Sequence, residues 1–322
     1  MESNTAPLLE MRGIKKDFFG NQVLTDINFT LKAGEVLGLA GENGAGKSTL
    51  MKILFGMDVI RETGGYGGDV LINGEKVTFN TPFDALEAGI GMVHQEFSLI
   101  PGFTATENIL LNREPQKKNV ISEVFGPRLN TLDYKKMKTK AAEAIDKMGV
   151  EIDQNMVISD MPVGHKQFTE IARELSKDQL KLLILDEPLS GLDPINTDLF
   201  KGIIREEIEA GKYLIMSSHQ MATVEEFCTD LTILDRSRTV LQGHLNDIKK
   251  GYGRVHLQLK TEEDAGPYIA ESGAQIVTRK EFEYQLKVTG QEQANDLLAR
   301  LTRAGVTVCL LYTSPSPRDV EE

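Results

Sequence analysis

The chain has 322 residues, of which 40% are apolar and 26% are charged, a balance typical of globular proteins rather than disordered ones. Its net charge of −12 argues against nucleic acid or an anionic membrane surface as the main partner, because both would favour a basic face. No apolar run approaches the roughly 18 residues needed to cross a bilayer, and two cysteines without C-x-x-C spacing indicate a reducing compartment and no cysteine-bound metal.

The first predicted elements flank a glycine-rich loop. The apolar run at 36–40 predicts a buried strand, and apolar residues at 50–54 recur at helical spacing before Gly56, a typical helix end. Between them stands GENGAGKS, which fits the pattern G-x-x-x-x-G-K-[ST]. A tight strand-to-helix turn would explain the glycines but not the lysine and serine that follow. We therefore predict a phosphate-binding loop.

In such a loop, backbone N–H groups point at phosphate oxygens, and the positive end of the following helix adds to their field. We expect Lys47 to reach the β- and γ-phosphates and the Ser48 hydroxyl to ligate Mg²⁺. The residues predicted to bind the nucleotide here are Gly41, Asn43, Gly44, Ala45, Gly46, Lys47, Ser48 and Thr49.

Further strands are predicted along the chain. Residues 61–80 indicate a β-hairpin region and 89–95 a buried strand. Residues 97–160 indicate a mainly helical insertion, and nearly continuous apolar runs return at 181–186 and 212–218. Such runs suit a parallel sheet covered on both faces. The alternation of strands and helices predicts an α/β fold.

Polar residues follow three of these strands. Asp186 and Glu187 end one run, Gln95 follows another, and His219 follows the third. An acidic pair at a strand end is also compatible with a solvated boundary, and a lone His or Gln is more often structural. Because open α/β sheets bind ligands beyond the carboxyl ends of their strands, we predict a shared site. Asp186 would hold Mg²⁺ through water, and Glu187 would polarise the attacking water. His219 would touch the γ-phosphate, and Gln95 would contact Mg²⁺ or the water.

The pattern changes beyond about residue 243. Strands are predicted at 255–260, 274–280, 283–290 and 306–312, with a helix over EQANDLLARLTRAG. The predicted domains are a nucleotide-binding cassette at 1–242, a small α+β accessory domain at 243–312 and a disordered tail at 313–322.

As a set, these motifs resemble the ATP-binding subunits of ABC transporters over about residues 7–250. GENGAGKST resembles the Walker A motif, LLILDEP the Walker B motif with Glu187 as catalytic base, and MVHQE the Q-loop. SGLDP resembles the D-loop with Asp193, and SSHQ the switch histidine. The resemblance implies a P-loop NTPase core with an ABC-type β-subdomain, and ATP and Mg²⁺ as cofactors. It also implies that Phe18 stacks on adenine, although an ordinary core Phe is the alternative.

The signature segment departs from the family pattern. Where the family usually has LSGGQ, this chain has MPVGHKQ at 161–167. Pro162 replaces the serine whose hydroxyl would contact phosphate, and proline has no N–H to substitute for it. The backbone amides around Gly164 and the dipole of the following helix remain. We expect a weakened but surviving contact with the γ-phosphate bound by a second cassette.

The resemblance implies a mechanism and partners. Two cassettes, as a homodimer or heterodimer, would close head to tail around two ATP molecules and move transmembrane permease subunits. One cassette without a membrane span would need both partners, so we expect a cytoplasmic protein held peripherally on the inner face of the membrane. The alternative is a nucleotide-binding regulatory module with weak or no hydrolysis. Soluble family members acting on ribosomes or DNA usually need two cassettes or a long coiled-coil insertion, and no nucleic-acid partner is expected.

The two halves of the chain resemble different branches of the family. The first half is similar to the first cassette of sugar-import ATPases, and the part from LLILDEPLSGLDP onward to multidrug or sodium exporter ATPases. CLLYTSPSPRD resembles translated sequencing-adapter sequence. Our hypothesis is a chimera with its seam near 180–190 and about a dozen non-native residues at the end.

Overall fold

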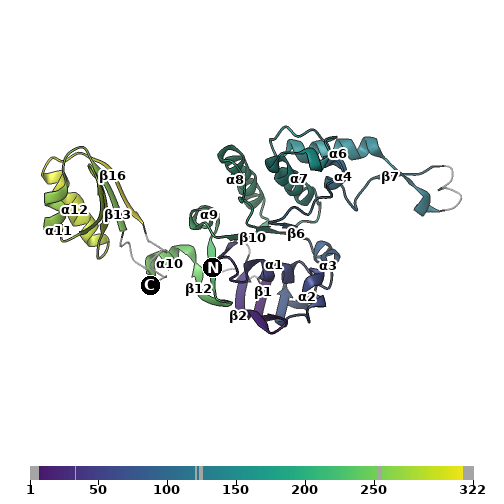
Figure 1. The fold of residues 1–322 in the computed structure, drawn as a ribbon, viewed down its shortest axis with the longest axis horizontal. Coiled ribbons are helices and arrows are strands. Elements are labelled where there is room, and N and C mark those ends of the chain that lie inside the picture. The colour runs from purple at the N-terminus through teal and green to yellow at the C-terminus, as the bar shows by residue number, and fades with distance from the viewer. Residues whose placement is uncertain (1–6, 33, 120–121, 123–125, 252–255, 315–322) are drawn as a thin grey trace, which may run out of the picture. The chain divides into compact units, whose positions relative to one another are not determined.

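The computed structural model describes residues 7–32, 34–119, 122, 126–251 and 256–314. By internal contacts the chain divides into two compact units, 1–242 and 243–322, each described by itself (Figure 1). Within the described ranges, no helix is both long and apolar enough to cross a membrane.

The central sheet of the larger unit is built from short apolar runs. Its strands, in spatial order, are β12 (Arg238–His244), β11 (Asp230–Asp235), β3 (Val36–Ala40), β10 (Tyr213–Ser218), β9 (Leu182–Asp186) and β6 (Ile90–Val93). From β11 to β6 each neighbouring pair is parallel. Every residue of β3, β9 and β6 is buried, as expected for parallel strands covered on both faces. Each fully buried Leu or Ile contributes about 1.5–3 kcal/mol relative to an exposed one.

The strand register brings several carboxyl ends to one edge of this sheet. Ser218 of β10 pairs with Ala40 of β3, and Ser217 pairs with Asp186 of β9. β6 ends beside the same part of β9. The residues that follow these strands are therefore neighbours, although up to about half of the chain separates them in sequence.

Helices connect the strands and cover the sheet. They are α1 (Lys47–Leu54), α2 (Asp58–Glu62), α3 (Pro82–Glu87), α8 (Pro194–Glu209) and α9 (Met221–Phe227). α3 begins with a capping box, in which Thr81 accepts from the N–H of Asp84 and the Asp84 carboxylate accepts from the N–H of Thr81. The apolar side of α1 joins β3, β9 and the second sheet in one core cluster.

The second sheet of this unit is antiparallel. Its strands, in spatial order, are β2 (Asn21–Leu31), β1 (Leu9–Phe18), β4 (Gly67–Ile72) and β5 (Glu75–Val77). Lys16 of β1 turns its ammonium inward and donates to the carbonyls of Ile60, Thr63 and Gly65 at 3.4, 2.9 and 2.7 Å. Burial lowers the pKa of Lys16, while the neighbouring Asp17 opposes that shift. The lysine thus satisfies carbonyls at and beyond the end of α2.

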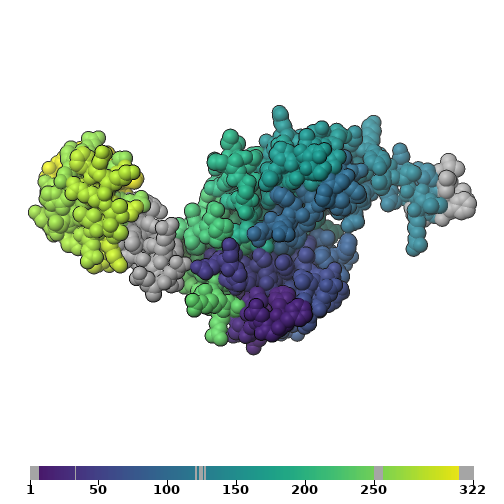
Figure 2. Space-filling view, viewed as in Figure 1, coloured from purple at the N-terminus to yellow at the C-terminus, as the bar shows by residue number. Residues whose placement is uncertain are grey.

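A group of helices forms the rest of the larger unit. They are α4 (Ala105–Ile109), α6 (Tyr134–Asp146) and α7 (Val163–Leu175), with 3₁₀ turns at Pro127–Leu129 and Ile158–Asp160 and the short strands β7 (Gln116–Lys117) and β8 (Thr131–Leu132). α4, α6 and α7 pack on one another, so the helical region continues beyond residue 160. In the space-filling view these helices lie on the opposite side of the unit from the second sheet, which β1, β2, β4 and β5 form (Figure 2). The arrangement confirms the predicted α/β class.

The smaller unit is α+β. Its elements are α10 (Leu245–Gly251), β13 (His256–Thr261), α11 (Gly266–Ser272), β14 (Gln275–Lys280), β15 (Glu283–Lys287), α12 (Gln291–Arg303) and β16 (Val308–Ser314). The strands form an antiparallel sheet in the order β14-β15-β13-β16. Tyr284 is buried in its core and donates its hydroxyl to Asp264 at 2.7 Å. β16 runs two residues into the predicted disordered tail, and residues 315–322 lie outside the described part.

Candidate functional site

The glycine-rich loop lies between β3 and α1, as the sequence predicted. Gly41, Gly44 and Gly46 all have positive φ, at 145°, 89° and 108°. A Cβ on Gly41 would stand 2.2 Å from the carbonyl oxygen of Leu234, and one on Gly46 would stand 2.8 Å from that of Val23. Only glycine fits these two positions, because both the backbone conformation and the space exclude a side chain. The loop is therefore a cradle of bare backbone.

Lys47 turns back into this loop. Its ammonium donates to the carbonyls of Gly41 and Glu42 at 2.6 and 3.1 Å and lies 3.6 Å from Oε1 of Glu187. The side chain is almost fully buried. Of the other predicted loop residues, Ala45 is buried, Ser48 and Thr49 are half-buried and Asn43 is exposed.

Asp186, at the end of β9, is hydrogen-bonded to residues of α1 and β10. Its Oδ1 accepts from the Ser48 hydroxyl at 3.2 Å and from the Ser217 hydroxyl at 2.6 Å. A hydroxyl and a carboxylate are oxygen ligands of the kind that Mg²⁺ prefers, and Mg²⁺ usually takes its other ligands from water and substrate phosphates. In the described residues no cluster of three or more acidic, His or Cys side chains could hold a metal alone. The donor set therefore fits a magnesium ion that arrives with a nucleotide.

Glu187 follows Asp186 in a left-handed conformation, with φ of 48°. For a residue other than glycine this conformation costs about 1–3 kcal/mol. Its Oε2 lies 2.8 Å from the ring Nδ1 of His219, the residue after β10. The backbone N–H of His219 donates to the same oxygen at 3.4 Å. Its Oε1 is buried and, within the described chain, has no hydrogen-bond partner, since Lys47 stays beyond hydrogen-bonding distance. A buried carboxylate oxygen left free in this way can accept a hydrogen bond from a water molecule.

Gln95 lies at the same edge of the sheet, two residues after β6. Its side chain is exposed, and no hydrogen bond in the described part of the structure joins it to Ser48, Asp186 or Glu187. Gln95 therefore follows a strand at the predicted edge, and its side chain faces solvent.

The predicted signature and D-loop residues lie next to each other. Pro162 is the N-cap of α7 and offers no side-chain cap. Asp193 is the N-cap of α8 and accepts from the backbone N–H and the side-chain amide of Asn196 at 2.9 and 2.7 Å. These hydrogen bonds, the backbone one first, lower the pKa of Asp193. A Cβ on Gly164 would stand 2.8 Å from Nδ2 of Asn196, so Asn196 links the two segments.

Phe18 ends β1 and is half-buried against the core of the larger unit. The Lys16 ammonium lies 4.6 Å from the centroid of its ring, a cation–π contact. The next residue, Phe19, is 92% exposed and has φ of 54°. Sequence reasoning did not consider Phe19, although the doubled aromatic before Gly20 was a visible signal. Ser217, which is hydrogen-bonded to Asp186 and Glu187, was not predicted either. Its position two residues before His219 could have indicated that it lies near the site.

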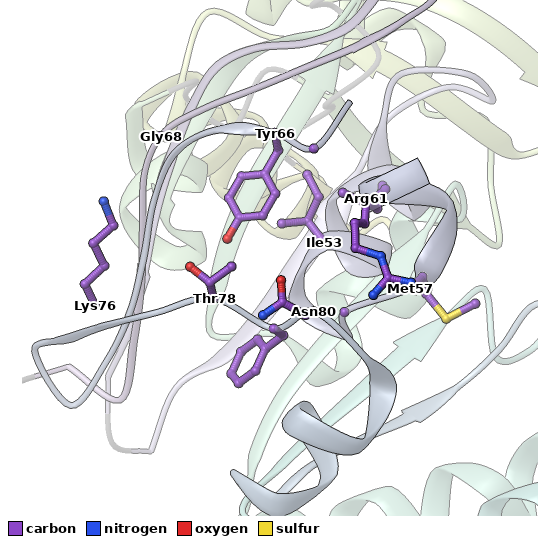
Figure 3. A pocket seen from close by; sticks show the side chains of 12 residues that line it. Ile53, Met57, Arg61, Tyr66, Gly68, Lys76, Thr78 and Asn80 are labelled. Carbon is purple, nitrogen blue, oxygen red and sulfur yellow. The ribbon is translucent and has the colours of Figure 1, made fainter. Parts of the chain in front are cut away.

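A cavity of about 240 Å³ lies elsewhere, between the end of α1, α2 and the β4–β5 hairpin. Figure 3 shows Tyr66 and Ile53 side by side in its wall, with Thr78 and Asn80 nearby. Its lining includes none of the predicted site residues, and it lies beyond the opposite end of α1 from the glycine-rich loop. This cavity is therefore separate from the glycine-rich loop.

Comparisons with known proteins agree with this geometry. The sequence profile described as "ABC transporter" matches residues 24–190, just over half of the chain. The chain is 35% identical over 244 residues to the ribose import ATP-binding protein RbsA of Caldanaerobacter subterraneus subsp. tengcongensis, a match covering 76% of this chain and 46% of that protein. It is 36% identical over 234 residues to the xylose import ATP-binding protein XylG of Thermoanaerobacter pseudethanolicus, covering 73% and 43%. The chain thus spans less than half the length of these relatives.

Solved structures show the same fold. A nucleotide-free ATP-binding cassette from an ABC transporter matches with a TM-score of 0.62 and 20% identity, covering 76% of this chain and 94% of that one. The dimeric post-hydrolysis cassette MJ0796, bound to ADP and Pi, matches with a TM-score of 0.60 and 22% identity, covering 74% and 98%. At these identities the likeness establishes the fold, and it confirms the expected P-loop NTPase core.

Proposed function

Because the chain belongs to the ABC transporter family, whose profile it matches over residues 24–190, we propose that it binds ATP and hydrolyses it to drive a membrane transporter. The observation that carries this proposal is the meeting of three groups at one sheet edge. These are the bare loop with Lys47, the Ser48–Asp186 pair at 3.2 Å, and Glu187, whose buried Oε1 has no hydrogen-bond partner in the described residues.

The chain's own residues divide the work of hydrolysis. The amides of the loop from Gly41 to Thr49 and the Lys47 ammonium would hold the β- and γ-phosphates. Ser48 and Asp186, with Gln95 as a further ligand or water contact, would hold Mg²⁺, which supplies charge neutralisation on the phosphates when bound. Glu187 would orient the attacking water and accept its proton through Oε1. His219, held on Oε2 at 2.8 Å, would fix the carboxylate and reach the γ-phosphate.

A second cassette and a permease are part of this proposal. Gly164 and Asp193 both lie close to Asn196, and we propose that this segment would meet the γ-phosphate of a partner cassette rather than that of its own loop. Phe18 is the proposed adenine contact. The protein would work at the inner face of the membrane through permease subunits, with residues 1–242 as the cassette and 243–312 as an accessory domain. The import names of the relatives favour sugar uptake as the transport process.

A regulatory module with weak hydrolysis is the second candidate, and Pro162 favours it. A proline as N-cap of α7 offers neither a hydroxyl nor an N–H to a phosphate across the dimer. The remaining amides and the helix dipole would still attract the anion. The two candidates differ in turnover rather than in ATP binding.

Calorimetric titration of ATP into the purified full chain tests binding, and phosphate release with Mg-ATP tests turnover. Lys47→Ala is the matched variant, because it removes the only ammonium inside the loop within the described residues. We expect Mg-ATP binding by the parent and at least about tenfold weaker binding by Lys47→Ala, since a hydrogen bond to a charged group is worth about 1.5–3 kcal/mol. Binding without phosphate release would favour the regulatory module. A parent chain that ignores ATP in the presence of Mg²⁺ would overturn both candidates.

A further inference from the structure

Ser217 is a fully buried serine at the carboxyl end of β10, with two hydrogen bonds of opposite direction. Its hydroxyl donates to Oδ1 of Asp186 at 2.6 Å and accepts from the backbone N–H of Glu187 at 2.9 Å. The Ser217 hydroxyl thus contacts the carboxylate of Asp186, the proposed Mg²⁺-binding group, and the backbone of Glu187, the proposed general base. The direct pairing of Ser217 with Asp186 in neighbouring parallel strands makes this possible.

We propose that Ser217 is a positioning residue that fixes the Asp186 carboxylate and the Asp186–Glu187 turn for Mg-ATP. This inference rests on the proposed function, because it concerns the same site. Ser217 would touch neither nucleotide nor water, and it would act only through its two neighbours.

The first step of the argument concerns Asp186. Its Oδ1 accepts from both Ser48 and Ser217, and the Ser217 contact is the shorter, at 2.6 against 3.2 Å. If the Ser48 hydroxyl binds a cation, it does so through a lone pair of its oxygen, and its O–H can still donate to Asp186. Ser217 does not itself face the ion in this proposal, so its shorter hydrogen bond would hold the carboxylate in place whether or not the ion is bound. Partners of this kind around metal ligands typically change metal affinity or activity by about 10- to 100-fold when removed.

The second step concerns Glu187. Its left-handed backbone, with φ of 48°, persists only if its surroundings hold it there. The hydrogen bond from its N–H to Ser217 is one such restraint, and the contact of its Oε2 with His219 is another. Without the Ser217 hydroxyl, the backbone N–H of Glu187 loses its hydrogen-bond acceptor. The backbone of Glu187 and the carboxylate of Asp186 are then no longer joined through a shared partner.

The test compares Ser217→Thr, which keeps the hydroxyl, with Ser217→Val, which has nearly the same shape without it. Mg²⁺ is titrated into the full chain with ATP, binding is followed by calorimetry and phosphate release is measured in parallel. We expect Ser217→Val to need about 10- to 100-fold more Mg²⁺ for half-maximal binding and to show a similarly lower kcat. Ser217→Thr should stay close to the parent, because threonine keeps the hydroxyl that donates to Asp186.

Thr232→Val is the matched control. Thr232 lies in β11 of the same sheet, is fully buried, and in the described structure its hydroxyl has no partner. Its removal should leave the Mg²⁺ requirement unchanged. If Ser217→Val does not fold, as judged by circular dichroism and thermal unfolding, Ser217→Cys takes its place, since a thiol is a weak donor in a similar volume.

The outcomes separate this inference from the proposed function. A parent that binds Mg-ATP, together with a folded Ser217→Val or Ser217→Cys with the parent's Mg²⁺ requirement, would overturn the role of Ser217 alone. Equal loss in folded Thr and Val variants would also overturn it, because shape rather than the hydroxyl would then matter. A parent that does not bind Mg-ATP would remove the proposed function, and this inference with it.

Discussion

Replacing Glu187 with glutamine tests the proposed chemistry most directly. The glutamine carbonyl can still accept from His219 at the position of Oε2, 2.8 Å from Nδ1. The side chain then presents an amide at the position of Oε1, the buried oxygen without a hydrogen-bond partner in the described residues. An amide cannot accept a proton from water. We therefore expect kcat to fall by about 10²- to 10⁴-fold, the usual loss on removing a general base.

This loss corresponds to a barrier higher by about 3–5 kcal/mol, at 1.36 kcal/mol for each factor of ten. ATP binding should not weaken. At 3.6 Å and an effective dielectric constant of 20, the gross attraction between Lys47 and Glu187 is about 4–5 kcal/mol. Removing the carboxylate releases Lys47 from this attraction, and the carbonyls of Gly41 and Glu42 still hold its ammonium inside the loop. The affinity for Mg-ATP is expected to stay equal or to increase.

The assay is phosphate release under steady-state and single-turnover conditions, with ATP affinity measured by calorimetry. Glu226→Gln is the control, because it makes the same chemical change on α9, where Glu226 pairs with Lys201 and Arg205. That variant should hydrolyse ATP like the parent. Turnover by Glu187→Gln within about threefold of the parent would refute the assignment of the base, since it falls far below the expected loss.

Three further predictions concern the loop, the aromatic contact and a buried acid. Gly46→Ala should lower the free energy of unfolding by about 1–3 kcal/mol, because φ is 108° and the new Cβ would stand 2.6 Å from Leu24 and 2.8 Å from the Val23 carbonyl. Thermal unfolding measures this loss. Gly44→Ala is the control and should lose less, because its Cβ would meet nothing within 4 Å. Phe18→Ala should weaken ATP binding about 2- to 10-fold in a fluorescence titration, the value of one aromatic stacking contact, and a loss in Phe19→Ala instead would move the adenine contact to the exposed ring. Burial raises the pKa of Glu170 above the usual value of about 4.3, although the Arg173 guanidinium opposes the shift. The folded state then holds more protons than the unfolded state, so ionisation of Glu170 lowers the free energy of unfolding as pH rises from that value through the folded pKa. Glu170→Gln should therefore reduce the fall of the unfolding midpoint over this pH range. An unchanged fall would contradict the raised pKa of Glu170.

The sequence predicted the framework of the site because each part had a local signal. The apolar runs of β3, β9 and β10 and the spacing of Lys47 and Ser48 in the loop are readable without tertiary information. The rule that ligands bind at carboxyl ends of parallel strands then placed Asp186, Glu187 and His219 together.

The parts that sequence could not predict depend on register and packing. That Ser217 rather than Ser218 faces Asp186 follows from the pairing of β10 with β9, which no local pattern encodes. The left-handed backbone of Glu187 is unusual for its residue type, so propensity argues against it. The roles of the individual site residues, the domain limits and the chimera hypothesis remain predictions; long-read sequencing of the genomic locus tests the last of these.

The buried ammonium of Lys16 gives the protein a natural chemical reporter. An acylating reagent needs an accessible, neutral amine, and Lys16 is 2% exposed with three carbonyls around it. Lys76 on the nearby β5 is largely exposed; its hydrogen bond to Asp69 raises its pKa, but its accessibility should still make it react before Lys16. The rate at which Lys16 becomes acylated, measured by mass spectrometry, would therefore report how often the β1–α2 contact opens locally. The rate at Lys76 would serve as the reference for an exposed amine.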